Sequence, residues 1–197
     1  LTEPLACCVH SINKARIKLG DTVVIIGMGI MGYFHLKLAL MRGARVIVSE
    51  MDPTRKQKAL DSGAHVVIDP GTQDLCEEVK RLTDGLGADV VVNTIPSAAV
   101  WNSAIQSLAP YGRLIAYSSQ DSKTPIGVDF GMMHSREIEF IGTLNPTIED
   151  NDIATKLITY HLIDMEEVID ARFPFEQGKE AFAAALKPGA YRVIIQY

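Results

Sequence analysis

The sequence has few of the features that mark membrane-spanning, secreted or nucleic-acid-binding proteins. Its charged residues sum to a net charge of −5 and no run of five Lys or Arg residues occurs, which argues against a nucleic-acid partner. No apolar run approaches the ~18 residues that a transmembrane helix needs. The N-terminus has no basic segment before an apolar core. We therefore expect no membrane span, no secretory leader and neither nucleic acid nor membrane as a partner.

Cysteine is also scarce. Cys7, Cys8 and Cys76 are an odd number of thiols without the spacing of a disulfide framework. This usage fits a reducing compartment and predicts a cytoplasmic protein. Adjacent cysteines have poor geometry for chelating one metal ion, so we interpret all three as small buried side chains.

The common patterns of metal and nucleophile sites are missing as well. The histidines are scattered without an H-x-x-x-H pair, and we interpret them as ordinary core or surface residues: His10, His35, His65, His134 and His161. Ser118 and Ser119 lack the G-x-S-x-G elbow of a hydrolase. Trp101 is expected in the core of a helix.

What the sequence does have is a run of β-branched residues that leads into a glycine motif. Residues 22–26 read Thr-Val-Val-Ile-Ile, and Gly27-Met28-Gly29-Ile30-Met31-Gly32 follows as a G-x-G-x-x-G. An amphipathic segment at 33–42 and a second apolar strand at 44–49 come next, and that strand ends at Glu50. Strand, glycine turn, helix, strand and acid form the dinucleotide-binding fingerprint in the context that it requires.

Each part of this motif has a physical role. Gly27 permits the tight turn, Gly29 lets the backbone approach a pyrophosphate, and Gly32 lets the helix pack closely on the strand. The start of the helix, at Ile30 and Met31, offers free N–H groups to phosphates. Glu50 can accept hydrogen bonds from the adenosine ribose. A glycine turn without a ligand is the alternative, but the agreement of all the parts favours a dinucleotide site.

Strands and helices alternate along most of the chain. We expect strands at residues 22–26, 44–49, 65–69, 89–93, 113–118 and 137–144. Helices are expected at 2–17, 33–42, 54–62, 72–82 and 98–108, with a looser link at 119–135. Local signals are a cap at Thr2, a cap at Thr72 and a turn at Pro110-Tyr111-Gly112. The alternation predicts an α/β fold, a doubly wound (Rossmann) parallel six-stranded sheet with helices on both faces.

The pattern changes after residue 145. Helices are expected at 149–160 and 176–186 and a terminal strand at 191–197, with a short segment at 165–169 that leads to Phe173-Pro174-Phe175. We interpret residues 18–145 as an NAD(P)-binding Rossmann domain, and residues 1–17 and 146–197 as flanking segments.

Several stretches carry a resemblance to a known family. They are Glu3-Pro4-Leu5-Ala6, the segment 19–25, the segment 58–64, the segment 136–142 and Phe173-Pro174-Phe175-Glu176. In their order and spacing, over essentially the whole chain, the sequence resembles the zinc-containing medium-chain dehydrogenases. The resemblance is strongest to the sorbitol and threonine dehydrogenase branch.

The resemblance implies an oxidoreductase that moves a hydride between NAD(H) and an alcohol or polyol. Family members begin with a GroES-like domain whose catalytic zinc is held by a cysteine and a Gly-His-Glu motif. This sequence contains no Gly-His-Glu. It therefore looks like the cofactor domain of a longer enzyme, whose flanking segments would pack against the missing domain; a natural short homologue is the alternative. We expect no catalytic residue in this chain, zinc only in the full-length parent, and no activity of the chain alone.

The resemblance also assigns further contacts. Arg55 matches a basic residue that contacts the adenosine ribose, with a solvated helix charge as the alternative. Tyr117 and Ser118 match positions at which relatives bind the nicotinamide. Thr143 and Asn145 match such positions as well.

Three more residues are candidates for contacts with the cofactor or a metal. Thr94 and Ile95 end the fourth strand, beside the expected crevice. Relatives often have Glu and Gly where this chain has Asn93 and Pro96, a departure that affects the adenosine contacts. Glu3 matches an acid that approaches the zinc, but we prefer a first-turn carboxylate favoured by the helix dipole, because one carboxylate cannot hold zinc without partners.

Cofactor choice and assembly follow from two segments. Glu50 favours NAD, because its carboxylate would repel the 2′-phosphate of NADP, and Met51 stands where NADP sites usually have Arg. The strand at 137–144 is expected at an exposed sheet edge, and relatives pair two-fold there, so we expect a homodimer.

Two other functions use similar motifs. A non-catalytic NAD-binding sensor or regulatory module is the alternative, and a Cys and a Gly-His-Glu upstream would favour the enzyme. An S-adenosylmethionine methyltransferase also uses a glycine turn and a ribose acid, but the resemblance over the whole chain argues against it.

Overall fold

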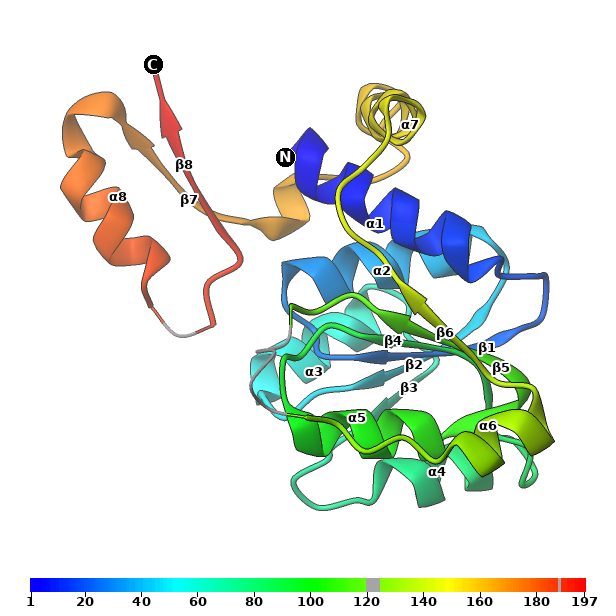
Figure 1. The fold of residues 1–197 in the computed structure, drawn as a ribbon. Coiled ribbons are helices and arrows are strands. Elements are labelled where there is room, and N and C mark those ends of the chain that lie inside the picture. The colour runs from blue at the N-terminus through cyan, green and yellow to red at the C-terminus, as the bar shows by residue number, and fades with distance from the viewer. Residues whose placement is uncertain (120–124, 188) are drawn as a thin grey trace.

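The main body of the protein is a parallel six-stranded sheet between two layers of helices (Figure 1). The computed structural model describes residues 1–119, 125–187 and 189–197. The strand order is β3-β2-β1-β4-β5-β6. The strands are β1 (Thr22–Ile26), β2 (Arg45–Ser49), β3 (Val66–Ile68), β4 (Ala88–Asn93), β5 (Leu108–Ala116) and β6 (Glu139–Gly142). The predicted doubly wound parallel sheet is confirmed.

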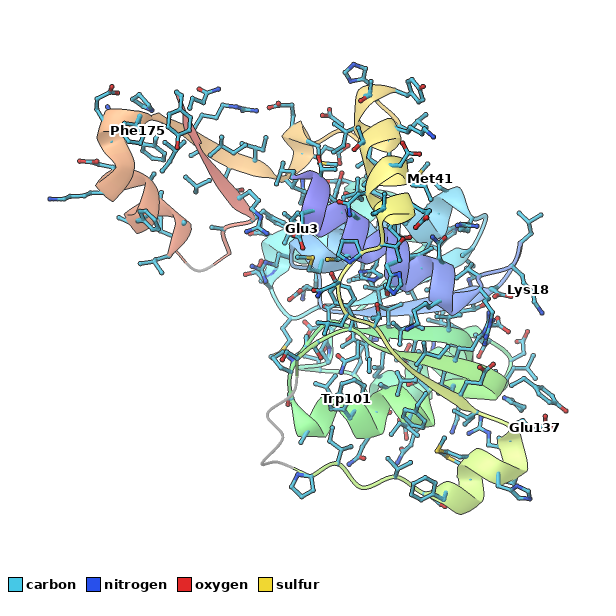
Figure 2. All side chains as sticks on the ribbon, turned by 45° about the horizontal axis from the view of Figure 1, so that its top comes forward. Glu3, Lys18, Met41, Trp101, Glu137 and Phe175 are labelled. Atoms are coloured by element: carbon cyan, nitrogen blue, oxygen red, sulfur yellow. The ribbon has the colours of Figure 1, made fainter. Side chains whose placement is uncertain are left out.

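The sheet divides the core into two hydrophobic clusters, and helices cover one cluster on each face. One face is covered by α1 (Thr2–Ala15), α2 (Ile30–Met41), α3 (Pro53–Asp61) and α7 (Ile148–Thr159). The other is covered by α4 (Leu75–Leu82), α5 (Ala98–Gln106) and α6 (Phe130–Arg136). Trp101 of α5 is buried in the second cluster, as predicted (Figure 2).

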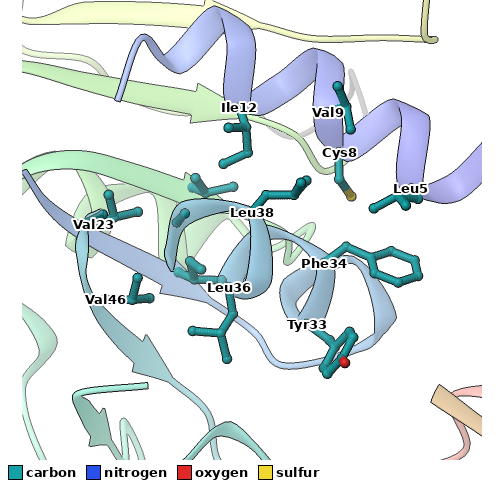
Figure 3. Packing of buried hydrophobic residues seen from close by; sticks show 14 of the residues in the cluster. Leu5, Cys8, Val9, Ile12, Val23, Tyr33, Phe34, Leu36, Leu38 and Val46 are labelled. Carbon is teal, nitrogen blue, oxygen red and sulfur yellow. The ribbon is translucent and has the colours of Figure 1, made fainter. Parts of the chain in front are cut away.

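The alternating side chains of β1 explain why the strand reads as an unbroken apolar run. Val23 and Ile25 join one cluster, and Val24 and Ile26 join the other. Both faces of a parallel strand are covered by helices, so both sets of side chains must be apolar. Figure 3 shows the face under α1, where Leu5, Val9 and Ile12 lie over α2.

The segment after α7 forms a small unit of its own. It contains the 3-10 turn Glu166–Val168, β7 (Ile169–Pro174), the 3-10 turn Phe175–Gln177, α8 (Gly178–Ala185) and β8 (Arg192–Gln196). β7 and β8 pair in parallel as a two-stranded sheet that carries α8, apart from the main sheet (Figure 1). We call β7, β8 and α8 the C-terminal unit. Along the described residues, every helix is too short or too polar to cross a bilayer.

The structure corrects several local expectations. α6 lies where we expected only a loose link, because Asp129 caps a helix of 7 residues that is too short to show a clear period. β7 was not predicted as a strand, because its pairing depends on β8, far along the chain. The expected turn at residues 110–112 lies inside β5, where the register with β4 shifts.

Two expected caps were also wrong. Asp74, and not Thr72, caps α4, because its side chain accepts a hydrogen bond from the Glu77 N–H. Thr2 lies inside α1, and Leu1 occupies the N-cap position.

Asp150 fastens α7 to α1. Its carboxylate lies 2.8 Å from His10 Nδ1 and accepts hydrogen bonds from Asn13 and from the Thr147 backbone and hydroxyl. Thr147 and Asp150 also form the capping box of α7. Burial alone would raise the pKa of Asp150, but the hydrogen bonds from Thr147, His10 and Asn13 outweigh burial and hold the pKa below its usual value.

Replacing this carboxylate should destabilise the fold. We expect Asp150→Ala to lower the free energy of unfolding by about 1–3 kcal/mol at neutral pH, since it removes the capping box and the hydrogen bonds of a buried carboxylate to His10, Asn13 and Thr147. A carboxyl with a lowered pKa stabilises the fold above its unfolded pKa of ~3.9 and loses that effect as the pH falls through the folded value. The difference from wild type should therefore shrink below about pH 4. Urea unfolding of both proteins at several pH values measures this difference in the free energy of unfolding.

Asp152→Ala is the matched control. Asp152 is 61% exposed, and its one ion pair among the described residues is with Lys156, one turn later on the same helix. Its loss should cost less than about 0.5 kcal/mol. Equal effects of the two substitutions would contradict the role given to Asp150.

Candidate dinucleotide site

The carboxyl ends of β1, β2 and β4 surround a cavity of about 340 Å³. Its lining consists of Gly27, Met28, Gly29, Ile30, Met31, Gly32, Glu50, Arg55, Thr94 and Ile95. All of these except Met28 were predicted as site residues from the sequence. The structure therefore brings together, at one end of the sheet, residues from four separate segments of the chain.

The three glycines of the loop serve different purposes. Gly27 has φ of +92°, and a Cβ there would lie 2.7 Å from Thr94 Oγ1. A Cβ on Gly32 would collide with the carbonyl oxygen of Gly27, so only glycine allows α2 to lie this close to the end of β1. Above Gly29, no described atom lies within 4 Å of the position of a Cβ.

The space above Gly29 faces the start of α2. Gly29 is the N-cap of this helix and, within the described residues, no side chain caps it. The first N–H groups of a helix have no partner within the helix and carry a partial positive charge. An uncapped N-terminus with open space above it fits a phosphate or pyrophosphate group.

Glu50 connects β2 to the glycine loop. Its Oε2 accepts a 2.7 Å hydrogen bond from the Met28 N–H, and its Oε1 accepts from the N–H groups of Met51 and Asp52 at 2.8 and 2.9 Å. An ionised carboxylate has about four acceptor positions. One position thus remains for a hydroxyl group of a ligand.

A second cavity of about 460 Å³ adjoins the first and shares Glu50 and Ile95 with it. Met51 lies here, together with Pro70, Leu75 and Val100 from the ends of β3, α4 and α5. This chiefly apolar space suits a flat ring such as a nucleobase. Of the residues that line this second cavity, the sequence predicted Glu50, Met51 and Ile95 as site residues and missed the others. Their position after parallel strands was the one available signal.

Arg55 brings a positive charge to the first cavity. Asp52 caps α3 by accepting from the Arg55 N–H, which sets the side chain one turn into the helix. The guanidinium carbon lies 5.5 Å from the ring centre of Tyr191. Its Nε is buried without a hydrogen-bond partner among the described residues.

The ends of β4 and β5 carry two more unpaired polar atoms. Asn93 Oδ1 accepts from the Ile95 N–H at 2.9 Å, but Asn93 Nδ2 has no partner in the described part of the chain. The same holds for Ser118 Oγ, while the Ser118 N–H donates to the Asn93 carbonyl. Buried polar atoms are normally paired, so these atoms point to a ligand or ordered water.

The remaining predicted residues are not among those that line the two cavities. The Tyr117 hydroxyl lies 3.2 Å from Met31 Sδ, and its ring meets His35 edge-on at 4.6 Å. Burial raises the pKa of Tyr117 and lowers that of His35 to about 4, so both side chains are neutral. Thr143 is half-buried and Asn145 exposed, both after β6. Their assignment to the nicotinamide stays a prediction.

Glu3 is exposed in the first turn of α1, where it accepts a 3.2 Å hydrogen bond from Cys7 Sγ (Figure 2). The described residues contain no group of three His, Cys, Asp or Glu side chains that could hold a metal ion. Glu3 by itself does not make a zinc site. Cys8 and Cys76 are buried as expected, but Cys7 is only half-buried. Burial and the hydrogen bond to Glu3 raise the pKa of the Cys7 thiol to about 11.

Comparison with known proteins gives a consistent result. The family model described as zinc-binding dehydrogenase matches residues 20–159. The chain is 31% identical to D-arabitol-phosphate dehydrogenase of Enterococcus avium, with 100% of this chain and 56% of that protein aligned. It is 27% identical to sorbitol dehydrogenase of Bacillus subtilis (strain 168), with 95% of this chain and 53% of that protein aligned. The chain thus spans little more than half the length of these relatives.

Solved structures show the same fold. A protein of Sinorhizobium meliloti 1021, described as a zinc-binding dehydrogenase and bound to NADP, superposes with a TM-score of 0.91 at 24% identity. The match covers 99% of this chain and 58% of that one. The structure of 2R,3R-butanediol dehydrogenase from Bacillus subtilis superposes with a TM-score of 0.90 at 21% identity, and the match covers 100% of this chain and 56% of that one.

The two helix glycines should respond differently to a methyl group. We expect Gly32→Ala to lower the free energy of unfolding by about 1–3 kcal/mol, because its Cβ would strike the Gly27 carbonyl. Gly29→Ala should cost at most about 1 kcal/mol, because the site is open and its backbone is extended, although alanine is a poorer N-cap than glycine. Chemical unfolding of both variants measures this. A Gly29→Ala cost as large as that of Gly32→Ala would show that the loop is packed differently.

Proposed function

The chain belongs to the zinc-binding dehydrogenase family of oxidoreductases, and we propose that it is the cofactor-binding part of an NAD-dependent alcohol or polyol dehydrogenase. The observation that carries the proposal is the uncapped start of α2 at Gly29, open above and adjoined by Glu50 and Arg55. The polyol dehydrogenase names of the relatives support the substrate class.

The residues of this chain would bind and orient the cofactor. The first N–H groups of α2 would hold the pyrophosphate. Arg55, which the resemblance assigns to the adenosine ribose, lines the same cavity, and we propose that its charge also lies beside the phosphates. Glu50 would accept a hydrogen bond from the adenosine ribose, and the apolar cavity beside Met51 would take the adenine. Thr94 and Ile95 would line the crevice beside the glycine loop. Tyr117, Ser118, Thr143 and Asn145 are proposed for the nicotinamide half. When bound, the nicotinamide supplies the acceptor carbon for a hydride.

The rest of the active site would come from the part of the relatives that this chain does not cover. Zinc, held there, would polarise the substrate oxygen. The C-terminal unit and the residues next to its elements expose four large apolar side chains, those of Phe175, Phe182, Leu186 and Tyr197. We propose that residues 146–197, together with residues 1–17, pack against the part that this chain does not cover. The chain alone would then bind cofactor without turning over alcohols. Three free thiols support a cytoplasmic location.

The choice of cofactor tests the role of Glu50. We expect NADH to bind at least about tenfold tighter than NADPH, roughly 1.4 kcal/mol, because a carboxylate at the ribose repels a 2′-phosphate. Glu50→Gln removes the charge but also sets an NH2 group against one of the backbone N–H groups that the carboxylate now accepts from, so both affinities should fall. The ratio of NADH to NADPH affinity should nevertheless move toward one, because the repulsion of the 2′-phosphate is lost. Fluorescence titration with each reduced cofactor measures the ratio. Glu149→Gln, an exposed acid on α7, is the control. Equal or tighter NADPH binding by the wild type would refute the assignment.

Assembly is the second test. We propose that two copies pair along β6, which is one of the two edge strands of the described sheet, the other being β3. Leu144, just after β6, is 83% exposed. Leu144→Lys should shift the chain from dimer to monomer in light scattering at roughly tens of micromolar. Leu186→Lys, at a residue that is also 83% exposed but follows α8, should not. A monomeric wild type would rule out pairing at this edge.

A further inference from the structure

Tyr191 lies just before β8, outside the six-stranded sheet, but its side chain reaches the glycine loop. Its hydroxyl donates a 2.7 Å hydrogen bond to the carbonyl oxygen of Met28, 163 residues earlier in the chain. Burial raises the pKa of Tyr191 to about 12, so the hydroxyl keeps its proton at neutral pH. Met28 is fully buried, so water does not compete for this carbonyl.

This bond completes the anchoring of one residue in the loop. Glu50 accepts from the Met28 N–H at 2.7 Å, and Tyr191 donates to the Met28 carbonyl. In a trans peptide the carbonyl and the next N–H point in opposite directions. Fixing the Met28 carbonyl therefore fixes the direction of the Gly29 N–H, at the start of α2.

The ring of Tyr191 has a second set of contacts. Arg55 Cζ lies 5.5 Å and Lys58 Nζ 5.6 Å from its centre. In the described part of the chain no carboxylate forms an ion pair with Arg55, and its Nε is buried without a partner. A ring holds a cation through its face and, unlike a carboxylate, does not neutralise it. The charge of Arg55 thus stays available at the cavity that it lines.

We propose that Tyr191 is a positioning residue for the phosphate-bearing part of the cofactor. Its hydroxyl sets the peptide that aims the Gly29 N–H, and its ring sets the guanidinium of Arg55. The inference rests on the proposed cofactor-binding function. It gives the segment leading into the C-terminal unit a role at the cofactor site, although that segment lies outside the glycine fingerprint.

The two contacts can be separated by substitution. Tyr191→Phe keeps the ring and removes the hydroxyl, which leaves the Met28 carbonyl buried and unpaired. Tyr191→Leu removes both contacts. Tyr160→Phe, at an exposed tyrosine that ends α7, is the matched control. Melting of the free proteins shows whether each variant is folded; if Tyr191→Leu is not, Tyr191→Phe decides the test alone.

Binding of NADH is followed directly by its fluorescence. Binding of ADP-ribose and of adenosine is measured by their competition with NADH. We expect Tyr191→Phe to weaken ADP-ribose binding about three- to tenfold and Tyr191→Leu about ten- to fiftyfold. Adenosine, which has no phosphate, should change less than about twofold with either variant. Arg55→Met should cost less affinity in the Tyr191→Leu background than in the wild type, because the two residues act together.

Other outcomes overturn the inference. Unchanged ADP-ribose binding by folded Tyr191→Phe and Tyr191→Leu would mean that Tyr191 does not position this site. Equal losses for adenosine and ADP-ribose would assign it a general role in the fold. A wild-type chain that binds neither NADH nor ADP-ribose would instead refute the proposed function, and the inference with it.

Discussion

The close approach of α2 to the end of β1 is the constraint on which the site depends. It requires glycine at position 32, because a side chain there would strike the Gly27 carbonyl. It also requires the left-handed turn at Gly27, with φ of +92°. Once these two conditions are met, the N-terminus of α2 opens directly above the carboxyl end of the sheet. The cavities, the position of Glu50 and the contact with Tyr191 all follow from this geometry.

Electrostatics at the site differ from those of the whole chain. The protein has a net charge of −5, which would disfavour a dianionic ligand on average. Locally, Arg55, Lys58 and Lys37 lie over the rings of Tyr33 and Tyr191. Lys37 pairs with Glu167, whereas Arg55 and Lys58 form no ion pair among the described residues. Arg55 therefore brings an unpaired positive charge to the cavity that Glu50 also lines. The local arrangement, rather than the total charge, decides which ligand fits.

The sequence was sufficient for the parts of the fold that depend on local pattern. The alternation of strands and helices predicted the sheet, the apolar run at residues 22–26 with the glycines after it predicted the loop, and the end of the second apolar strand predicted Glu50. Each of these has a short-range signal. The apolar cavity could not be predicted, since Pro70, Leu75 and Val100 come from three separate segments. Tyr191 was missed for the same reason: its partner Met28 is 163 residues away. β7 was missed because its only neighbour in the described sheet is the terminal strand β8.

Amide hydrogen exchange with and without NADH tests the central claim most directly, namely that the start of α2 holds the cofactor. The account predicts slower exchange on NADH binding in residues 28–33 and 50–55, with little change in α6 or at the amino ends of the strands. Protection confined to other parts of the chain, or none at saturating NADH, would contradict it.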